Sequence, residues 1–160
     1  MNEDSYTYPV VTMKGLIPRS PGFKRIAHRG ASGEAPENTL PAIALAVKTY
    51  KVDMVEIDLH LTRDGVPVVI HDERLERTTD GKGFVRSRVL KEIKSYDAGF
   101  HFDPEGKNLF PYRGKGVTIP TLEEVLREFP QTYFFLEVKE SDPASARKVL
   151  DVIERTPGKG

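Results

Sequence analysis

The chain has 160 residues, the size of a single domain with a sizeable core, and nothing in it indicates two domains. Its 24 Lys and Arg residues balance its 24 Asp and Glu residues, so no overall field draws in nucleic acid or an anionic membrane, and a small molecule is the expected partner. The sequence lacks cysteine, which excludes disulfides, a cysteine nucleophile and a thiolate metal site.

Residues 1–24 form an N-terminal extension that mixes acidic residues, tyrosines and prolines. This stretch lacks the basic start and the unbroken apolar run of a signal peptide. No later apolar run reaches the length of a transmembrane segment. We therefore expect a soluble, cytoplasmic protein.

From residue 25 onward, strands and helices alternate. We predict a strand over 25–28, a helix over 40–50 that is capped by Asn38 or Thr39, and a strand over 54–61. A turn at Asp64-Gly65 connects that strand to a third run that ends at His71.

Residues 72–117 show little periodicity apart from a short helical segment near 89–95, and we interpret them as an insertion. Thr121 and Glu124 then form a capping box for the next helix. A strand over 132–139 and a last helix that begins near Asp142 follow. This order is typical of a parallel α/β fold and favours a (β/α) barrel.

The strand over 54–61 has one apolar and one ionised face. Alternation places Glu56, Asp58 and His60 together, opposite the apolar side chains of Val55, Ile57, Leu59 and Leu61. In a barrel the apolar face packs against the outer helices, so the two carboxylates point toward the barrel axis. There they need a cation or a polar partner.

The strand over 132–139 repeats this pattern, with Glu137 and Lys139 on one face. Three carboxylates without a thiolate suit a divalent cation, and Mg²⁺ and Ca²⁺ are equally compatible with such ligands. Two alternatives remain open: Glu56 and Asp58 form ion pairs with Arg29 or Lys139, or Glu137 and Lys139 simply pair with each other.

Five motifs occur in order and at suitable spacing: HRGASGEAPENT, EIDLHLTRDGVPVVIHD, DAGF, IPTLEEVL and FLEVK. Together they resemble the glycerophosphodiester phosphodiesterase family over residues 25–153. The resemblance implies a TIM (β/α)8 barrel of the PLC-like phosphodiesterase type. It also implies metal-dependent hydrolysis of glycerophosphodiesters to sn-glycerol 3-phosphate and an alcohol, by acid/base catalysis with two histidines.

The resemblance further implies roles for individual residues. The catalytic pair is His28 and His71, the metal ligands are Glu56, Asp58 and Glu137, and the phosphate-contacting residues are Arg29 and Lys139. Glu37 and Asn38 are expected to fix a loop and a helix start, and His60 is expected to act behind the site. His101 either lines the pocket of the leaving alcohol or packs within an aromatic cluster.

A TIM barrel needs about 250 residues and eight strands, and we count three barrel strands here. We therefore expect a truncated domain over 25–160, with open barrel edges that allow self-association. This length keeps a second function open, a non-catalytic fragment or interaction module. A third is a phosphodiesterase that acts like a lysophospholipase D.

Overall fold

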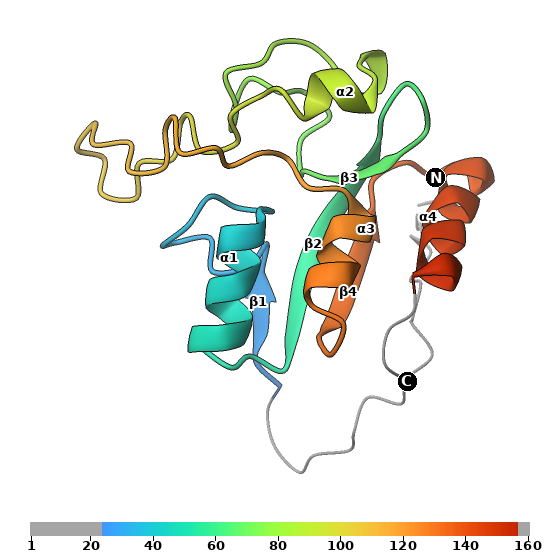
Figure 1. Ribbon diagram of the computed structural model, residues 1–160, viewed down its shortest axis with the longest axis horizontal. Coiled ribbons are helices and arrows are strands. Elements are labelled where there is room, and N and C mark those ends of the chain that lie inside the picture. Colours follow the sequence, from blue (N-terminus) through green and yellow to red (C-terminus); the bar gives the residue numbers. More distant parts are fainter. Residues whose placement is uncertain (1–23, 157–160) are drawn as a thin grey trace, which may run out of the picture.

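The computed structural model describes residues 24–156, so the predicted N-terminal extension lies outside the described residues apart from Lys24. The elements follow the predicted order (Figure 1). The strands are β1 (Ile26–His28), β2 (Met54–Leu61), β3 (Pro67–Val69) and β4 (Tyr133–Val138). The helices are α1 (Leu40–Ala44), the π-helical turn η1 (Leu45–Thr49), the 3₁₀ turn η2 (Val85–Ser87), α2 (Leu90–Ile93), α3 (Leu122–Glu128) and α4 (Pro143–Arg155).

The sheet is organised around β2. Strands β1 and β4 pair with β2 in parallel, whereas β3 pairs with it in antiparallel fashion, as expected after the turn at Asp64-Gly65. The register places His28 beside Glu56 and Asp58 beside Glu137. The prediction of a parallel α/β fold is thus confirmed. Within residues 24–156 the sheet does not close, and a complete barrel stays a prediction.

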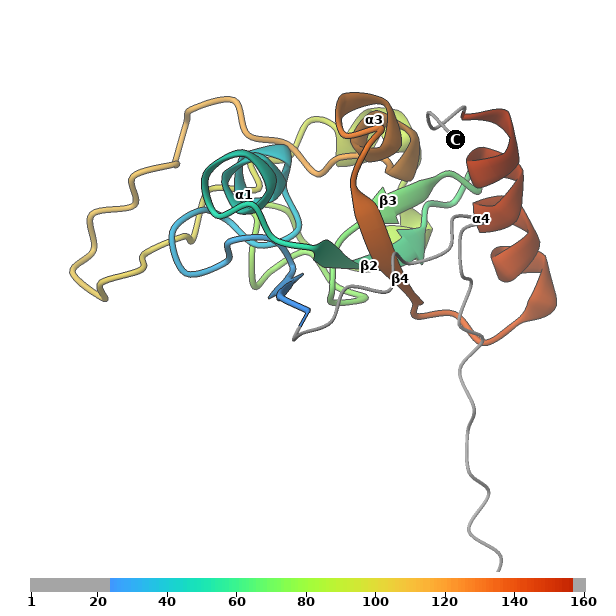
Figure 2. The same cartoon turned by 90° about the horizontal axis from the view of Figure 1, so that it is seen from below.

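The apolar face of β2 forms the core, because alternate side chains of this strand point toward the helices. Val55, Ile57 and Leu59 are fully buried. They pack with apolar side chains of α1, α3 and α4. Figures 1 and 2 show these three helices around the sheet. Each such side chain contributes about 1.5–3 kcal/mol of burial energy. This packing leaves the opposite face of β2 free for its polar residues.

Two helix starts agree with the sequence. At α3, the Thr121 hydroxyl accepts a hydrogen bond from the Glu124 backbone N–H at 3.1 Å, and the Glu124 carboxylate accepts one from the Thr121 N–H at 2.8 Å. At α4, the Asp142 carboxylate accepts the Ser145 N–H at 2.9 Å. These caps satisfy backbone donors that would otherwise lack partners.

The first helix differs from the prediction at both ends. Thr39 occupies the N-cap position, but its side chain makes no cap and instead donates to the Pro36 carbonyl at 2.5 Å. Asn38 is not a cap either, because its side chain turns toward β2. The predicted helix over 40–50 is α-helical only to Ala44 and continues as a π-helical turn.

Residues 72–117 lie above the carboxyl ends of the strands (Figure 1). They have a small core of their own, in which Leu75, Val85 and Ile93 are fully buried. Val68 and Ile70, at the end of the hairpin, pack into the same cluster. The segment is therefore fixed to the end of the sheet where the predicted site residues lie. Among residues 24–156, no helix is long and apolar enough to cross a membrane.

Candidate active site

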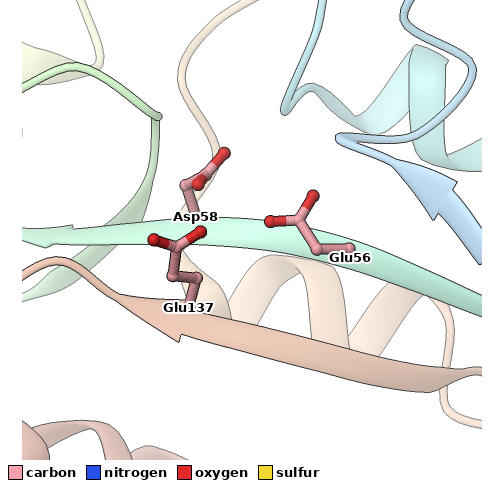
Figure 3. A group of neighbouring side chains, drawn as sticks. All are labelled: Glu56, Asp58 and Glu137. Carbon is pink, nitrogen blue, oxygen red and sulfur yellow. The ribbon is translucent and has the colours of Figure 1, made fainter. Parts of the chain in front are cut away.

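Three carboxylates converge on the polar face of the sheet (Figure 3). Glu56 and Asp58 come from β2 and Glu137 comes from β4, and one ligand oxygen from each lies within 4.8 Å of the others. The parallel register aligns Asp58 with Glu137, while the period of two along β2 keeps Glu56 on the same face. Glu56 is 9% exposed and Asp58 is completely buried, so these two charges are largely removed from water.

The charges of this trio fit a divalent cation. Burial, followed by the negative charge of Asp58, raises the pKa of Glu56 above its ordinary value. Asp58 Oδ1 is buried, and the ammonium of Lys139 lies 2.8 Å from it. Oxygen ligands without a thiolate match the preference of Mg²⁺ and Ca²⁺. The donor set and the crowding of the three carboxylates favour a hard cation at this position.

Lys139 follows β4 and lies among these carboxylates. Its Nζ forms ion pairs with Asp58 Oδ1 at 2.8 Å and with Glu137 Oε1 at 2.7 Å. Burial alone would raise the pKa of Asp58, but the Lys139 ammonium and the Asn38 amide outweigh it, so that pKa is lowered. The two carboxylates likewise outweigh burial at Lys139 and raise its pKa.

His28 and Arg29 lie at the end of β1. The His28 side chain is 69% exposed, with Nε2 4.0 Å from Glu56 Oε2. The backbone N–H of Arg29 donates to the same carboxylate oxygen at 3.0 Å. Arg29 adopts a positive φ of 57°, and its guanidinium Nε lies 3.3 Å from Asp58 Oδ2. His28 and Arg29 of the HRG motif therefore border the carboxylate trio.

His71 follows β3 and comes to the same end of the sheet. Its Nδ1 lies 2.6 Å from Asp72 Oδ1, and its ring is about one-third exposed. A positive charge on the His71 ring is close enough to lower the pKa of Asp58. All seven residues singled out in the sequence thus gather around one site, with His28 at the end of β1 and His71 in the chain after β3.

Two residues that sequence reasoning assigned to loop structure contact the site directly. The Asn38 amide donates to Asp58 Oδ2 at 2.8 Å, and its carbonyl accepts the Asp58 backbone N–H at 3.3 Å. Glu37 accepts hydrogen bonds from Arg29 at 3.1 Å and from Arg77 at 2.7 Å and 2.9 Å. Their position directly before the first helix, in the EN of HRGASGEAPENT, was the available signal.

His60 follows Asp58 by two positions on β2 and contacts the backbone of His71. Its Nδ1 is 2.9 Å from Glu140 Oε1, and its Nε2 is 3.1 Å from the backbone carbonyl oxygen of His71. The ring is largely buried. His60 therefore connects the chain after β4 to the backbone of the predicted catalytic histidine.

A cavity of about 350 Å³ lies between the loop after β1 and the insertion. Glu37, Arg77, His101 and Phe102 are among its lining residues. His101 also packs edge-on against Phe100, with ring centroids 4.9 Å apart. His101 thus packs against an aromatic ring and lines a cavity, and its role toward the leaving alcohol stays a prediction.

Known proteins are similar to this chain in sequence. A profile described as the glycerophosphoryl diester phosphodiesterase family matches residues 28–155. A glycerophosphodiester phosphodiesterase of Bacillus subtilis (strain 168) is 39% identical over 137 residues, which are 81% of this chain and 45% of the relative. A lysophospholipase D of Homo sapiens is 35% identical over 132 residues, which are 82% of this chain and 41% of the relative.

The fold is also similar to solved structures. A phosphodiesterase from Oleispira antarctica, solved in complex with the product sn-glycerol-3-phosphate, superimposes with a TM-score of 0.70 at 37% identity. The match covers 86% of this chain and 54% of that structure. The chain thus spans about half the length of the relatives it matches. Because the family profile covers most of its residues, this chain belongs to the glycerophosphoryl diester phosphodiesterase family.

Proposed function

We propose that this chain hydrolyses glycerophosphodiesters to sn-glycerol 3-phosphate and an alcohol, with a divalent cation, Mg²⁺ or Ca²⁺, as cofactor. The observation that carries the proposal is the trio of Glu56, Asp58 and Glu137, whose oxygens lie within 4.8 Å of one another inside the segment that matches the family. The substrate class is supported by the names of the relatives from Bacillus subtilis and Oleispira antarctica.

Glu56, Asp58 and Glu137 would hold the cation. When bound, the cation supplies Lewis-acid stabilisation of the charge on the phosphoryl oxygens. Arg29 and Lys139 add positive charge to the same region, because both lie beside Asp58. Preorganised positive charge of this kind is commonly the largest contribution to such catalysis.

His28 and His71 are proposed to move the protons. One imidazole accepts the proton of the attacking hydroxyl, and the other donates a proton to the oxygen of the leaving alcohol. Both histidines lie at strand ends on the side of the sheet that carries the carboxylates. A positioned acid or base of this kind contributes about 10²- to 10⁴-fold to the rate.

The test is glycerol 3-phosphate release from glycerophosphocholine by the purified chain, with Mg²⁺, with Ca²⁺ and with a chelator. We expect release that depends on the metal and falls by about 10²- to 10⁴-fold in His28→Ala and His71→Ala. Glu56→Ala should abolish the metal dependence together with the activity. Absence of release from a folded sample would reject glycerophosphocholine as substrate, and absence of release from lysophosphatidylcholine as well would favour the non-catalytic interaction module.

A second substrate class deserves a parallel assay, because the human relative is a lysophospholipase D at 35% identity. Lysophosphatidylcholine offers the same phosphodiester with an acyl chain on the glycerol. Choline release from it, compared with release from glycerophosphocholine at equal concentration, distinguishes the two substrates. Faster release from lysophosphatidylcholine than from glycerophosphocholine would identify the lysophospholipid as the better substrate. The proposed roles of the residues would stay the same.

A further inference from the structure

Arg77 lies in the insertion, six residues after His71, and its guanidinium joins two carboxylates. Nε and Nη2 donate to Asp72 at 2.7 Å and 2.9 Å. Nη1 and Nη2 donate to Glu37 at 2.9 Å and 2.7 Å. Four of the five N–H donors of an arginine are thus directed to protein carboxylates, in the fork geometry that lysine cannot reproduce.

Both carboxylates continue to residues of the candidate site. Asp72 Oδ1 lies 2.6 Å from His71 Nδ1, and Glu37 Oε1 accepts a hydrogen bond from Arg29 Nη1 at 3.1 Å. The contacts therefore run without interruption from His71 through Arg77 to Arg29. They connect the chain after β3 with the loop after β1, which are the segments that carry the proposed acid/base and phosphate-binding groups.

The charges of this path fix the proton on His71. The Arg77 guanidinium holds the pKa of Asp72 well below its usual range. At Glu37, burial raises the pKa, but Arg77 and Arg29 outweigh it and the pKa is lowered. Both groups are therefore ionised at neutral pH, and an ionised carboxylate only accepts hydrogen bonds. His71 Nδ1 must then carry a proton toward Asp72, which leaves Nε2 as the basic nitrogen of the neutral ring.

We propose that Arg77 is a positioning residue that acts on both sides of the site. Through Asp72 it fixes the orientation and tautomer of His71, and through Glu37 it fixes the guanidinium of Arg29. The expected effect of Arg77 on the reaction rate rests on the proposed hydrolase function. The expected effect of Arg77 on the His71 tautomer does not. Arg77 itself is committed to the protein and does not serve as a phosphate ligand.

The direct test observes the His71 ring in the full chain. The sequence has four histidines, so long-range ¹H–¹⁵N spectra of a ¹⁵N-histidine sample resolve every ring, and His71→Gln assigns the signal. At pH 8 without metal, we expect the Nδ1–H tautomer for His71 in the wild type. We expect a mixture of tautomers in Arg77→Met and in Asp72→Asn.

Arg74→Met is the matched control. Arg74 has a side chain 50% exposed, close to the 45% of Arg77, and its ion pair with Glu76 lies outside the path described above. We expect the His71 signal of this variant to match that of the wild type. An Nε2–H tautomer in the wild type, or an unchanged tautomer in folded Arg77→Met, would overturn the proposal. Thermal unfolding identifies a variant that fails to fold. If Arg77→Met does not fold, Arg77→Lys takes its place, because lysine keeps the positive charge but loses the forked hydrogen bonds. A mixture of His71 tautomers in Arg77→Lys supports the proposal, and an unchanged tautomer overturns it.

Kinetics with glycerophosphocholine and Mg²⁺ test the catalytic side. Arg77→Met should lower kcat by about 10- to 100-fold, the usual cost of removing a group that orients another. The effects of residues that act as a unit do not add. The double variant with Asp72→Asn and Arg77→Met should therefore lose little more kcat than the worse of the two single variants. Additive losses would contradict action through Asp72. A wild type without activity would reject the hydrolase, and the tautomer experiment would still decide the role of Arg77.

Discussion

At the scale of single residues, Lys139 has two roles that oppose each other. Its ammonium lies 2.7–2.8 Å from carboxylate oxygens of Glu137 and Asp58, where it competes electrostatically with a cation, yet the same charge is proposed to contact the phosphate. Lys139→Met should therefore bind Mg²⁺ about 10-fold more tightly, since removing a nearby like charge favours the cation. Titration calorimetry measures this affinity.

The same substitution should reduce glycerol 3-phosphate release despite the tighter binding of metal. Lys148→Met is a suitable control, because Lys148 lies on α4, outside the carboxylate trio. We expect this control to retain the wild-type metal affinity. Weaker binding of Mg²⁺ by Lys139→Met would show that Lys139 supports the carboxylates instead of competing for them.

The pH dependence of stability follows from Asp72 and Glu37. Their pKa values are lowered in the folded chain, so the folded state binds fewer protons than the unfolded state between the two sets of values. The stability they contribute is present above the ordinary carboxylate range near about pH 4 and is lost as the pH falls toward the folded values. Urea unfolding from pH 7 to pH 3 should show this decline.

Asp72→Asn should show a smaller decline over the same pH range, because one of the responsible carboxylates is absent. Asp151→Asn removes an exposed carboxylate that pairs with Arg147 on α4 and provides the comparison. We expect it to keep the wild-type slope. Equal slopes in all three proteins would contradict the assignment of the decline to Asp72.

Part of the site was predictable from strand periodicity, whereas His28, Arg29 and His71 were predicted from the resemblance of the motifs to a known family. Glu56 and Asp58 share a face through strand alternation, and the register of β4 adds Glu137. Arg77 and Glu37 were missed for a physical reason. They are 40 positions apart in the chain, in segments without periodicity, and only the folded insertion brings them together.

At the scale of elements, the connection between β1 and α1 depends on Gly30. This residue has a φ of +81°, and a Cβ there would lie 2.7 Å from the Ala42 carbonyl carbon. Gly30→Ala therefore combines a left-handed backbone, which costs about 1–2 kcal/mol for an L-residue, with a backbone clash. We expect the free energy of unfolding to fall by about 2 kcal/mol or more.

Gly33→Ala is a control within the same loop, since nothing lies within 4 Å of a Cβ at that position. Its free energy of unfolding should stay within about 0.5 kcal/mol of the wild type. Urea unfolding with far-UV circular dichroism measures both variants. Similar stabilities for the two would contradict a close contact between Gly30 and α1.

The elements themselves were largely predictable, and the exceptions have physical causes. Periodicity and capping residues located β2, α3 and α4 within a few residues. The prediction of a side-chain cap for α1 was wrong. Asn38 forms hydrogen bonds with buried Asp58 instead of with the helix. A buried carboxylate gains more from such a donor than a helix start gains from its cap.

At the scale of the whole molecule, the polar face of the sheet carries apolar residues next to the site. Ile26, Tyr133 and Phe135 are 55%, 38% and 40% exposed. Within residues 24–156, β4 pairs only with β2, so its other edge offers backbone groups to a further strand. We expect self-association that increases with protein concentration. Sedimentation velocity over a range of concentrations measures it.

Phe135→Asp should shift the equilibrium toward the monomer, because it places a charge on the exposed face. Leu109→Asp is the comparison, since Leu109 is 67% exposed in the insertion. It should leave the association unchanged. A monomeric wild type at every concentration, or equal effects of the two substitutions, would contradict association through the sheet.

The Lys139 ammonium among the carboxylates also bears on whether the chain folds before or after it binds a metal. A cluster of three buried or half-buried acids would normally resist assembly until a metal neutralises it. Here Lys139, two positions after Glu137 in the same strand register, brings its own positive charge as the strand docks. If the trio binds a cation as proposed, we expect the chain to reach its native packing without divalent ions and to bind the cation afterwards, so that metal supply controls activity and not the yield of folded protein.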